Sequence, residues 1–599
     1  MAISAHAGTT PVVVLGMATP GLSWRRSDLV AQEALVNRET RRANLVPAGR
    51  SLAYVGGGLI VLFVLGVVLY PSLVLIYNSF LTRGQLSLAN YARLLSQPDT
   101  YEVLRNSLTV SLLGTGGATA LGVFLAWLVA RSDVPFKAFW RAVLIVPYLI
   151  PPFIGAIAWV YLLGPVGFIN KFWMFLTGDR LLVIYGPVGI VLVMILYGYP
   201  IAYLVTLGPF EKTNPALEEA ARISGAGTFR TFRDVTLPLI MPNVWAAGLL
   251  IFMSLMANFG IPAVLGFPRR YFVLTTKIYA TVLNFDQANN LQLAAALSMV
   301  LVVLALLGLQ IQRLVLARGR YAVISGKVSQ PQLVELGAIR PLALGFLALL
   351  VLITVVAPIA AIFLTSLIKA VGLPLVSSSL SLKHYSDLLF AVPKVRRAFL
   401  NSFLLATGSA TIIALLSIVI GYFLTRLRIR GGRLLEMLII IPYAVPGTVV
   451  ALAMILAFLQ PLPLVNFSLY NTIWILLIAY IARFLTFGVR STSAALEQIH
   501  ESLEEEARIS GADLVRAIKD ITLPLIKPSV YAGWFLAFMP ALTELTLSIL
   551  LYSVNNETLG VVVFGLHQEG KVGLTAALAF LVTILVLGLN LATHRKLEL

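Results

Sequence analysis

The sequence predicts an all-α polytopic membrane protein, with twelve transmembrane helices arranged as two parallel six-helix halves. Composition is the first observation behind this prediction, because 59% of the 599 residues are apolar and only 12% are charged. Soluble domains are about half apolar and about a quarter charged. The second observation is a series of apolar runs of about 20 residues or more, the length that crosses a bilayer. The third is a polar segment that occurs twice, once in each half of the chain.

Twelve apolar runs fall into two groups of six on either side of a long polar segment. The first six spans are expected near 52–80, 106–130, 142–164, 182–207, 243–266 and 292–312. The second six are expected near 341–368, 400–425, 435–459, 470–492, 529–552 and 572–594. Because six is an even number, both halves enter the membrane from the same side. The repeat is therefore parallel, about an axis along the membrane normal.

The loops give the orientation and the domain boundaries. Most of the 44 Lys and Arg residues fall in loops on the side of the N-terminus, which predicts that both termini are cytoplasmic. The expected parts are a cytoplasmic tail at 1–50, a first half at 51–312, a cytoplasmic linker at 313–340 and a second half at 341–599. Loop charges of this kind explain the net charge of +18, so the lipid bilayer is an expected partner and nucleic acid is not.

The sequence lacks the residues that disulfides, metal sites and an ATP-binding motif require. The chain has no Cys, which excludes disulfides and thiolate sites, and its five His residues form no metal-ligand pair, so no metal site is expected. The stretch from Gly565 to Lys571 has the glycine spacing of a phosphate-binding P-loop, but Val572 replaces the hydroxyl residue that would bind Mg²⁺. No catalytic residue is assigned. We expect a transport subunit without an ATPase motif of its own, not an enzyme.

An internal repeat relates the two halves residue by residue. The sequence EAARISGA at 219–226 recurs as EEARISGA at 505–512. The sequence VTLPLI at 235–240 recurs as ITLPLI at 521–526, and both blocks are offset by 286 residues. Two copies with the same internal spacing indicate that this segment has a specific role in each half.

Matching prolines predict that two of the spans are broken. Pro147 and Pro151 in the third span correspond to Pro442 and Pro446 in the ninth. A proline lacks the N–H of an intrahelical hydrogen bond, so these positions leave backbone carbonyls unpaired. Such breaks are tolerated inside a membrane where neighbouring helices or a cavity satisfy the freed groups. We therefore expect broken helices in the third and ninth spans.

The repeated polar segment lies between the fourth and fifth spans of each half, at 211–242 and 497–528. In the first copy, Pro215 suits a first helical turn. Glu218 and Glu219 place negative charge near the positive end of the helix dipole. These residues predict that a short helix begins each segment.

A glycine turn and a second helix are expected to follow. Gly225 ends the first helix as a C-terminal capping residue does. A second amphipathic stretch at 228–235 is expected to end at or just before Leu237, because Pro238 follows. The second copy repeats this pattern over 504–524. An ordinary connector at the membrane interface is the alternative, but a connector does not need a fixed sequence in two copies.

This segment resembles the EAA loop of the permease subunits of ATP-binding-cassette (ABC) importers, which reads Glu-Ala-Ala, three residues, Gly, nine residues and Ile-x-Leu-Pro. The residues that match are Glu219, Ala220, Ala221, Gly225, Val235, Leu237 and Pro238 in the first copy and Glu505, Ala507, Gly511, Ile521, Leu523 and Pro524 in the second. The departures are Glu506, which stands where the family has its first Ala, and mildly Val235. The resemblance extends from about residue 50 to the end and implies the fold of a type I ABC importer permease.

By this resemblance, each loop forms a coupling helix that docks into a cleft on an ATPase subunit. The partners so implied are a homodimer of ABC ATPase subunits at the cytoplasmic face and an extracytoplasmic substrate-binding protein. No cofactor is expected on the chain itself, because ATP and Mg²⁺ would be used by the partner subunits. The implied location is the cell inner membrane, which the chain crosses many times.

A few polar residues interrupt the apolar spans. They are Thr543, Glu544 and Thr546 in the eleventh span, Asn258 in the counterpart region of the fifth, and Arg483 midway along the tenth. Polar groups are costly in a bilayer and tend to serve a function there. Two interpretations stay open. Glu544 and Arg483 form a structural pair that locks two spans, or the carboxylate and its polar neighbours line the substrate pathway, where a carboxylate favours a cation.

Two features bear on the substrate. The two halves are fused in one chain, which resembles the ferric iron, thiamine and 2-aminoethylphosphonate permeases, and the stretches 543–548 and 479–491 resemble ferric iron permeases. We therefore expect ferric iron import, with thiamine, 2-aminoethylphosphonate or polyamine as alternatives. An ion-coupled secondary transporter of two halves would need more charges in its spans and leaves the repeated loops unexplained. A membrane scaffold without transport would show no substrate-stimulated ATPase.

Overall fold

The computed structural model describes residues 57–287, 289–318, 333–370, 373, 376–427, 431–461 and 466–597. The expected tail at 1–50 and residues 319–332 of the expected linker lie outside these residues, and the domain boundaries stay a prediction. The membrane helices belong to one compact unit, Ile60–Leu599. The sheet found in the described residues is a single hairpin of β1 (Leu81–Thr82) and β2 (Gln85–Leu86).

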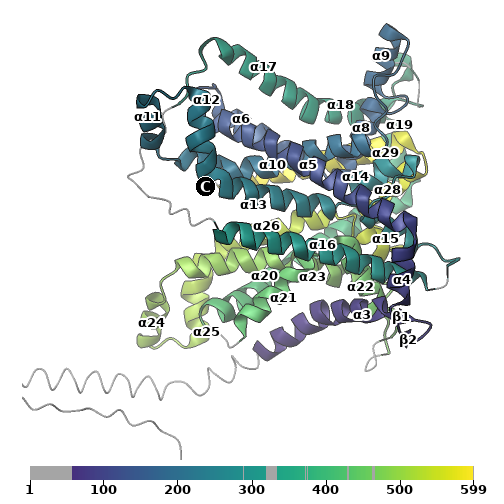
Figure 1. The fold of residues 1–599 in the computed structure, drawn as a ribbon. Helices are drawn as coiled ribbons and strands as arrows, with labels where there is room; N and C mark the ends of the chain where they lie inside the picture. The colour runs from purple at the N-terminus through teal and green to yellow at the C-terminus, as the bar shows by residue number, and fades with distance from the viewer. Residues whose placement is uncertain are drawn as a thin grey trace, which may run out of the picture. The chain divides into compact units, whose positions relative to one another are not determined.

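The first half contains long membrane helices joined by short surface helices (Figure 1). The symbol η marks a π-helical or 3₁₀ stretch. In chain order, its helices are η1 (Leu65–Leu69), α3 (Tyr70–Ser79), α4 (Ala89–Ser96), α5 (Pro98–Arg131), α6 (Lys137–Val143), α7 (Val146–Leu149), α8 (Pro152–Leu163), α9 (Phe168–Thr177), α10 (Pro187–Lys212), α11 (Pro215–Ile223), α12 (Thr228–Thr231), η2 (Phe232–Thr236), α13 (Leu237–Met256), α14 (Gly260–Gly266), η3 (Phe267–Arg269), α15 (Leu274–Val282) and α16 (Asn290–Arg318).

The second half repeats the order of the long helices, although its described residues contain no counterpart of α9 between α22 and α23. Its helices are η4 (Gly337–Ile339), α17 (Arg340–Val351), η5 (Leu352–Val356), α18 (Ala357–Leu367), η6 (Ser377–Ser379), α19 (Lys383–Ser386), η7 (Asp387–Ala391), α20 (Pro393–Thr425), α21 (Gly432–Ala444), α22 (Gly447–Phe458), α23 (Ile473–Gln498), α24 (Ser502–Ile509), α25 (Leu514–Ala517), η8 (Ile518–Thr522), α26 (Leu523–Leu542), α27 (Ser548–Leu551), α28 (Leu559–Gln568) and α29 (Val572–Leu597).

Eleven helices in the described residues are long and apolar enough to cross a membrane, and a bent pair supplies a twelfth span. The pair is Gly432–Tyr443 and Gly447–Phe458, which bend by 106° at a break that includes Pro446. The helix counted as the third span, Pro152–Thr177, starts after a break at Ile150 and Pro151, so it begins and ends later than the predicted 142–164, and α6 and α7 precede the break. The prediction of an all-α protein with twelve spans is confirmed. The ninth span is broken at Pro446 as predicted, and the matching break at Pro151 lies just before the counted helix.

The fifth and eleventh spans differ from the prediction at both ends. Their helices begin inside the polar segments, at Thr228 and Leu514, and they end at Met256 and Leu542. The remaining residues of each predicted span, which reach to 266 and 552, lie beyond a break and include the short helices α14 and α27. The first turns of both helices contain polar and charged residues, and the prediction, which looked for apolar runs, therefore started both spans too late.

Pro238 does not end a helix as predicted, and neither does its counterpart Pro524. In both copies a five-residue π-helical stretch, η2 or η8, stands just before the Leu-Pro pair, and the helix continues into α13 or α26. The N–H of Leu237 donates to the carbonyl of Phe232. In an α-helix the proline ring clashes with the carbonyl four residues back, and the wider π-helical turn moves that carbonyl away.

The same solution recurs at other prolines of the bundle. The five π-helical stretches found in the described residues each end two residues before a proline. These prolines are Pro71, Pro238, Pro358, Pro393 and Pro524. At Pro71, Pro238, Pro358 and Pro524 the helix continues through the proline, whereas the non-helical Val392 separates η7 from α20 at Pro393.

The first helix of each half packs against the other half. α3 lies against α16 of its own half and α22 of the second half, whereas α18 lies against α29 of its own half and α8 of the first. Glycines let central helices come close. A Cβ at Gly122 would lie 2.4 Å from the carbonyl oxygen of Tyr199, and one at Gly488 would lie 2.6 Å from Cγ2 of Ile413. Small residues at such contacts are typical of membrane bundles, where dispersion between closely packed helices contributes much of the stability.

Candidate functional site

The two repeated polar segments form matching helical hairpins at one end of the bundle (Figure 1). In the first hairpin, the side chain of Asn214 caps α11 by accepting a hydrogen bond from the N–H of Ala216 at 3.0 Å. The turn after α11 contains Gly225 at φ +84°, and the N–H of Ala226 donates to the carbonyl of Ala221 at 3.0 Å. A residue with positive φ at this position usually has to be glycine. The structure thus has the predicted helix and glycine turn.

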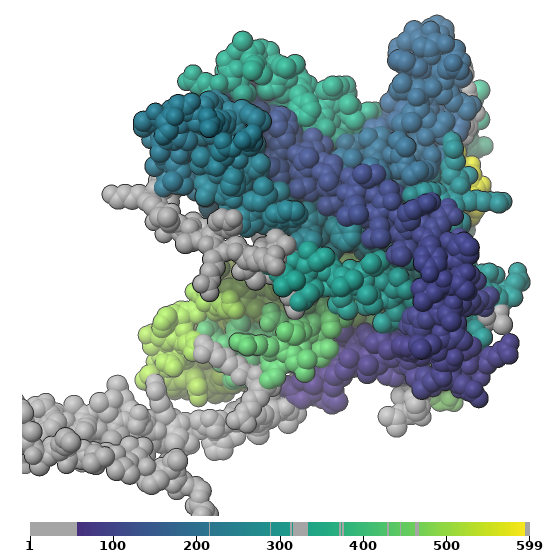
Figure 2. Space-filling model, viewed as in Figure 1, coloured from purple at the N-terminus to yellow at the C-terminus, as the bar shows by residue number. Residues whose placement is uncertain are grey.

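The second hairpin repeats this geometry. The turn after α24 contains Gly511 at φ +97°, and the N–H of Ala512 donates to the carbonyl of Ala507 at 3.0 Å. Figure 2 shows the two hairpins as separate protrusions on the same side of the molecule. Of the sequence-predicted residues, Glu219, Ala220 and Glu505 are exposed, while Ala221 and Ala507 are half-buried. Leu237, Pro238, Leu523 and Pro524 lie beyond the hairpin turns, inside the continuous helices that lead into the membrane.

Exposed apolar side chains stand at matching positions on the two hairpins. The most exposed pair is Ile223 at 88% and Ile509 at 85%. The other matching pairs are Leu217 with Leu503 and Phe229 with Val515. Exposed apolar side chains that recur at matching positions are typical of a surface that contacts another molecule. Sequence reasoning missed these residues, although their repetition at the offset of 286 was a signal that could have found them.

A buried glutamate fixes each hairpin to the membrane helices. Glu218 is 4% exposed, forms an ion pair with Arg131 at the end of α5, and accepts a hydrogen bond from the hydroxyl of Thr236 at 2.7 Å. Glu504 is 8% exposed and accepts the matching hydrogen bond from the hydroxyl of Thr522 at 2.6 Å. Each glutamate thus holds its hairpin to the helix that enters the membrane as the fifth or eleventh span. We call these two arrangements the glutamate anchors.

The second anchor has two further partners. The Tyr422 hydroxyl donates to Glu504 at 2.9 Å, and the Nε atom of Arg426 lies 3.6 Å from the Glu504 carboxylate. Both residues are at the end of α20, as Arg131 is at the end of α5. A buried carboxylate needs such partners, because an unpaired charge in a protein interior costs several kcal/mol. A hairpin held in this way cannot shift without displacing the ends of two membrane helices.

Sequence reasoning assigned Glu219 and Glu505, and it passed over the role of the buried glutamate that precedes each of them. The resemblance to the EAA loop pointed to the exposed neighbour. The signal that could have found the anchors was the repetition of their partners, since Thr236 and Thr522 occupy equivalent places in the two copies. The roles of the predicted coupling residues themselves stay a prediction.

Asn258 and Glu544 occupy equivalent positions at the breaks in the fifth and eleventh spans. The side-chain oxygen of Asn258 accepts a hydrogen bond from the N–H of Ile261 at 3.0 Å, in the first turn of α14. The carboxylate of Glu544 accepts one from the N–H of Leu547 at 2.7 Å, just before α27. Each side chain thus accepts one backbone N–H group at the break, close to the start of the short helix that follows.

Arg483 lies at the break in the ninth span, close to the same region. Its guanidinium donates to the carbonyl of Val445 at 3.1 Å. Within the part of the chain that the structure describes, no ion pair of 4.0 Å or less joins it to Glu544. Thr546 packs beside Gly447, where an added Cβ would lie 2.9 Å from Cγ2 of the threonine. Thr543 directly follows α26. The assignment of these residues to the pathway stays a prediction.

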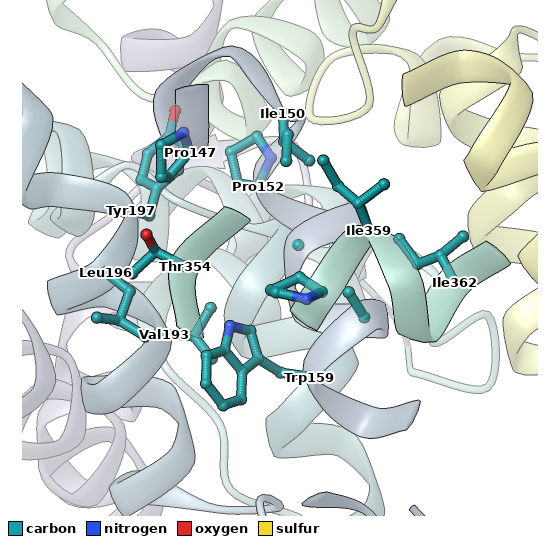
Figure 3. Close-up of a pocket in the computed structure, with 13 residues that line it drawn as sticks. Pro147, Ile150, Pro152, Trp159, Val193, Leu196, Tyr197, Thr354, Ile359 and Ile362 are labelled. Atoms are coloured by element: carbon teal, nitrogen blue, oxygen red, sulfur yellow. The ribbon is translucent and has the colours of Figure 1, made fainter. Parts of the chain in front are cut away.

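A small cavity of about 40 Å³ lies beside the broken third span (Figure 3). Its walls come from α7, α8 and α10 of the first half and from η5 and α18 of the second. Pro147 and Tyr197 lie at one side of it, and Ile359 and Ile362 lie at another. Almost all of the lining is apolar, so the cavity offers few ligands to a charged substrate. The polar residues around Glu544 are the better candidates for a pathway.

The stretch that resembles a P-loop by spacing has a different structure. It forms the end of α28 and a turn at Gly570, with φ +72°, before α29 begins. A P-loop instead connects a strand to a helix. The carboxylate of Glu569 accepts hydrogen bonds from Lys571 at 2.7 Å and Lys394 at 3.1 Å, and these two cations hold the pKa of Glu569 below its ordinary value.

Residues 118–321 and 413–595 match the family model described as binding-protein-dependent transport system inner membrane component. The chain belongs to this family. Each matched region covers most of one predicted half, the first reaching into the predicted linker at 313–321, so two permease halves are fused in one chain. The protein is thus a transport subunit that crosses the inner membrane many times.

This permease is similar over most of its length to ferric transport permeases. The putative ferric transport system permease protein FbpB 1 of Haemophilus influenzae is 27% identical over 511 residues, which are 83% of this chain and 77% of that protein. The ferric transport system permease protein FbpB of Actinobacillus pleuropneumoniae is 25% identical over 542 residues, or 89% of this chain and 76% of that protein. The spermidine/putrescine transport system permease protein PotB of Salmonella typhimurium is 31% identical over 218 residues, which are 35% of this chain and 74% of that protein.

Proposed function

We propose that this permease forms the substrate pathway of an ABC importer for ferric iron and couples that pathway to separate ATPase subunits. The observation that carries the coupling role is the pair of glutamate-anchored hairpins, each with an exposed apolar face. The two relatives named for ferric transport match 83% and 89% of the chain, and this favours ferric iron as the substrate. The polyamine relative matches only 35% of the chain, so polyamine is the weaker candidate.

The partners follow from this role. Each hairpin docks one subunit of an ATPase homodimer at the cytoplasmic face, with Ile223 or Ile509 at the contact. ATP and Mg²⁺ bind to those subunits, and no cofactor is assigned to the permease itself. An extracytoplasmic binding protein delivers the substrate to the opposite face. Because the hairpins are cytoplasmic, both chain termini are cytoplasmic as well.

The glutamate anchors give the coupling a mechanical route. When ATP draws the two ATPase subunits together, the docked hairpins move with them. Glu218 passes the movement to Arg131 on α5 and to Thr236 at the start of the fifth span. Glu504 does the same in the second half. The two halves then change their relative position, the pathway between them opens outward, and ATP hydrolysis returns it inward.

The test is uptake into proteoliposomes that hold this permease with its ATPase subunits and binding protein. Labelled ferric iron, thiamine, 2-aminoethylphosphonate and spermidine are offered in parallel, with and without ATP. We expect ferric iron uptake that requires both ATP and the binding protein. Uptake of another ligand instead would overturn iron and keep the importer. Transport that does not require ATP and is driven by an ion gradient would overturn the proposal of an ABC importer and favour a secondary transporter.

A further inference from the structure

An open groove of about 450 Å³ lies on the surface of the first half. Its apolar and aromatic lining comes from the end of α3, from α4 and α5, and from α16, and it includes Phe80, Leu88, Tyr91, Leu104, Met299 and Val303. Figure 1 shows α4 and the β1–β2 hairpin at the end of the bundle opposite α11 and α24. Val303 is 50% exposed on the span Asn290–Ile311, so the groove opens toward the bilayer. We call it the α4 groove.

Hydrogen bonds hold α4 in place as one wall of this groove. The side-chain amide of Asn90 donates to the carbonyls of Ser79 and Leu81, at 3.2 and 3.0 Å. The hydroxyl of Tyr91 donates to the hydroxyl oxygen of Ser79 at 2.7 Å, and its ring packs on Phe80 with centroids 5.1 Å apart. The wall therefore cannot close into the groove without breaking these contacts. Because an empty space gives its lining no dispersion contacts, the α4 groove favours an occupant.

The second half contains counterparts of these walls. The hydrogen bond between tyrosine and serine recurs between Tyr385 and Ser366, whose hydroxyl oxygens lie 2.6 Å apart. The sequence LAAAL at 293–297 of α16 recurs as LTAAL at 574–578 of α29. These two matches relate the residues around the groove to those of the second half.

Aromatic rings occupy the corresponding place in the second half. By these matches, Phe580 stands at the position of Met299, and Phe363 stands at the position of Ile76. The rings of Phe580 and Phe363 pack on each other with centroids 4.9 Å apart. Neither Met299 nor Ile76 has a ring, and the groove beside Met299 stays open. One half thus fills this place with its own side chains, and the other leaves room for another molecule.

Three arginines stand close in the chain to the lining of the groove. Arg83 is in the turn between β1 and β2, Arg93 is on α4, and Arg105 directly follows a lining residue of α5. All three are exposed, and among the described residues no ion pair is found for any of them. At the positions of Arg93 and Arg105, the second half has Asp387 and Leu400. These exposed cations thus belong to the half that has the open groove.

We propose that the α4 groove binds one acyl chain of an acidic phospholipid, whose headgroup lies among the three arginines. The apolar lining suits a hydrocarbon chain, and unpaired arginines at a membrane interface attract anionic headgroups. A helix of a partner protein fits less well, because a helix about 10 Å across would fill 450 Å³ with only about one turn. The lipid lies where α3 meets α16, and α3 also packs on α22, so it supports the contact between the halves.

The test is photolabelling of the full-length permease in phosphatidylcholine vesicles that contain a trace of a photoreactive phospholipid. The probe carries a diazirine in one acyl chain and has either a phosphatidylglycerol or a phosphatidylcholine headgroup. After illumination, mass spectrometry identifies the peptides that carry lipid. We expect the phosphatidylglycerol probe to label the peptides of Leu104 and Met299 at least about fivefold more than the phosphatidylcholine probe, because one arginine near an anionic lipid is worth about this factor.

Matched variants test the groove and the charges separately. Val303→Trp fills the groove from α16 and should reduce labelling of the Leu104 peptide to the background level. Ile584→Trp is the control, because Ile584 has the corresponding position on α29 and is 49% exposed, and it should keep the labelling. A triple variant should lose the preference for phosphatidylglycerol and keep labelling by phosphatidylcholine; its changes are Arg83→Gln, Arg93→Gln and Arg105→Gln. Size-exclusion chromatography before reconstitution shows that each variant is folded.

Three results would overturn the proposal. The first is labelling of the Leu104 and Met299 peptides that is no stronger than labelling of the Phe580 peptide, or that Val303→Trp leaves unchanged. The second is equal labelling by the two probes, which excludes an acidic lipid. The third is a co-purifying membrane protein whose removal is needed before the probe reaches the groove. This site goes beyond the proposed function, and because the labelling needs neither ATP nor iron, a failure of ferric uptake would leave it standing.

Discussion

The two hairpins share one kind of anchor but give it different partners. In the first half, Glu218 and Arg131 form a pair whose side chains are only 6% and 1% exposed. In the second half, Arg426 lies 3.6 Å from Glu504 and 3.7 Å from the exposed Glu501, so its charge is shared. A buried pair loses far more when one partner is removed than a shared and partly exposed one does. The first anchor therefore depends on one ion pair, while the carboxylate of the second anchor has further partners.

One of these further partners is a hydrogen-bond donor that the first half does not have at the matching position. Tyr422 donates to Glu504 at 2.9 Å, whereas the matching residue in the first half is Trp127, whose ring packs on Phe232 with centroids 5.5 Å apart. The same helix position thus supports the carboxylate in one half and an apolar contact in the other. Similar hairpins can be anchored through different combinations of charge, hydrogen bonding and packing.

The first anchor is also joined to the chain that leads into the second half. The N–H of Val334 donates to the carbonyl of Arg131 at 2.7 Å, and the N–H of Asp133 donates to the carbonyl of Val334 at 3.1 Å. Arg340, at the start of α17, lies 3.8 Å from Asp133. The matching place after α20 includes residues 428–430, which lie outside the described residues. The first anchor is therefore linked by these hydrogen bonds and this ion pair to the chain that begins the second half.

The largest expected effect is that of Arg131→Ala. This change leaves Glu218 buried without its counter-charge and should lower the free energy of unfolding by about 3–5 kcal/mol. Arg426→Ala should cost about 1–3 kcal/mol, because Glu504 keeps the hydrogen bonds from Tyr422 and Thr522. The measurement is unfolding of the purified permease in mixed lipid–detergent micelles. Equal losses in the two variants would show that the anchors do not differ in strength.

A smaller effect is expected for Tyr422→Phe, which removes one hydrogen bond to a charged group and should cost about 2 kcal/mol. In the Arg426→Ala background the cost should be larger, because Glu504 then loses two partners. In the Arg131→Ala background the two costs should simply add, since the sites share no partner. The double-mutant cycles use the same unfolding measurement. Additive costs in both backgrounds would contradict a shared network around Glu504.

The smallest effect is expected where the hairpins are alike. Gly225→Ala and Gly511→Ala should each cost about 1–2 kcal/mol, because an L-residue is strained at positive φ. Space is not the reason, since a Cβ at either glycine would meet nothing within 4 Å. The two costs should agree within error in the unfolding measurement. A bulky residue at both positions should also uncouple ATP hydrolysis from uptake, and normal uptake by that double variant would count against the coupling role.

Local signals in the sequence are enough for much of this fold. Apolar length predicts the twelve spans, matching prolines predict the breaks at Pro151 and Pro446, and the glycines predict the two turns. These features depend on a few neighbouring residues and on the bilayer thickness. The π-helical stretches before Pro238 and Pro524 are harder to predict, because a proline in a helical pattern ordinarily signals an end.

The anchors depend on contacts between distant residues. Glu218 and Arg131 are 87 residues apart in the chain, and the sequence around either one does not indicate the other. Glu544 and Asn258 are noticeable as polar residues in apolar spans, but the backbone N–H groups that they accept belong to breaks that appear only in the folded chain. The internal repeat is the one sequence signal that relates such distant residues, because a functional pair recurs in both halves.

The central claim is that both hairpins dock ATPase subunits through their exposed apolar side chains. The most direct measurement is co-purification of the ATPase subunits with the double variant Ile223→Glu and Ile509→Glu, together with ATP-dependent uptake. Phe285→Glu is the matched control, since Phe285 is 83% exposed in the loop after α15, at the other end of the bundle. The double variant should insert normally but lose both the ATPase subunits and uptake, while the control keeps its ATPase subunits. A double variant that still binds and uses its ATPase subunits would contradict the claim.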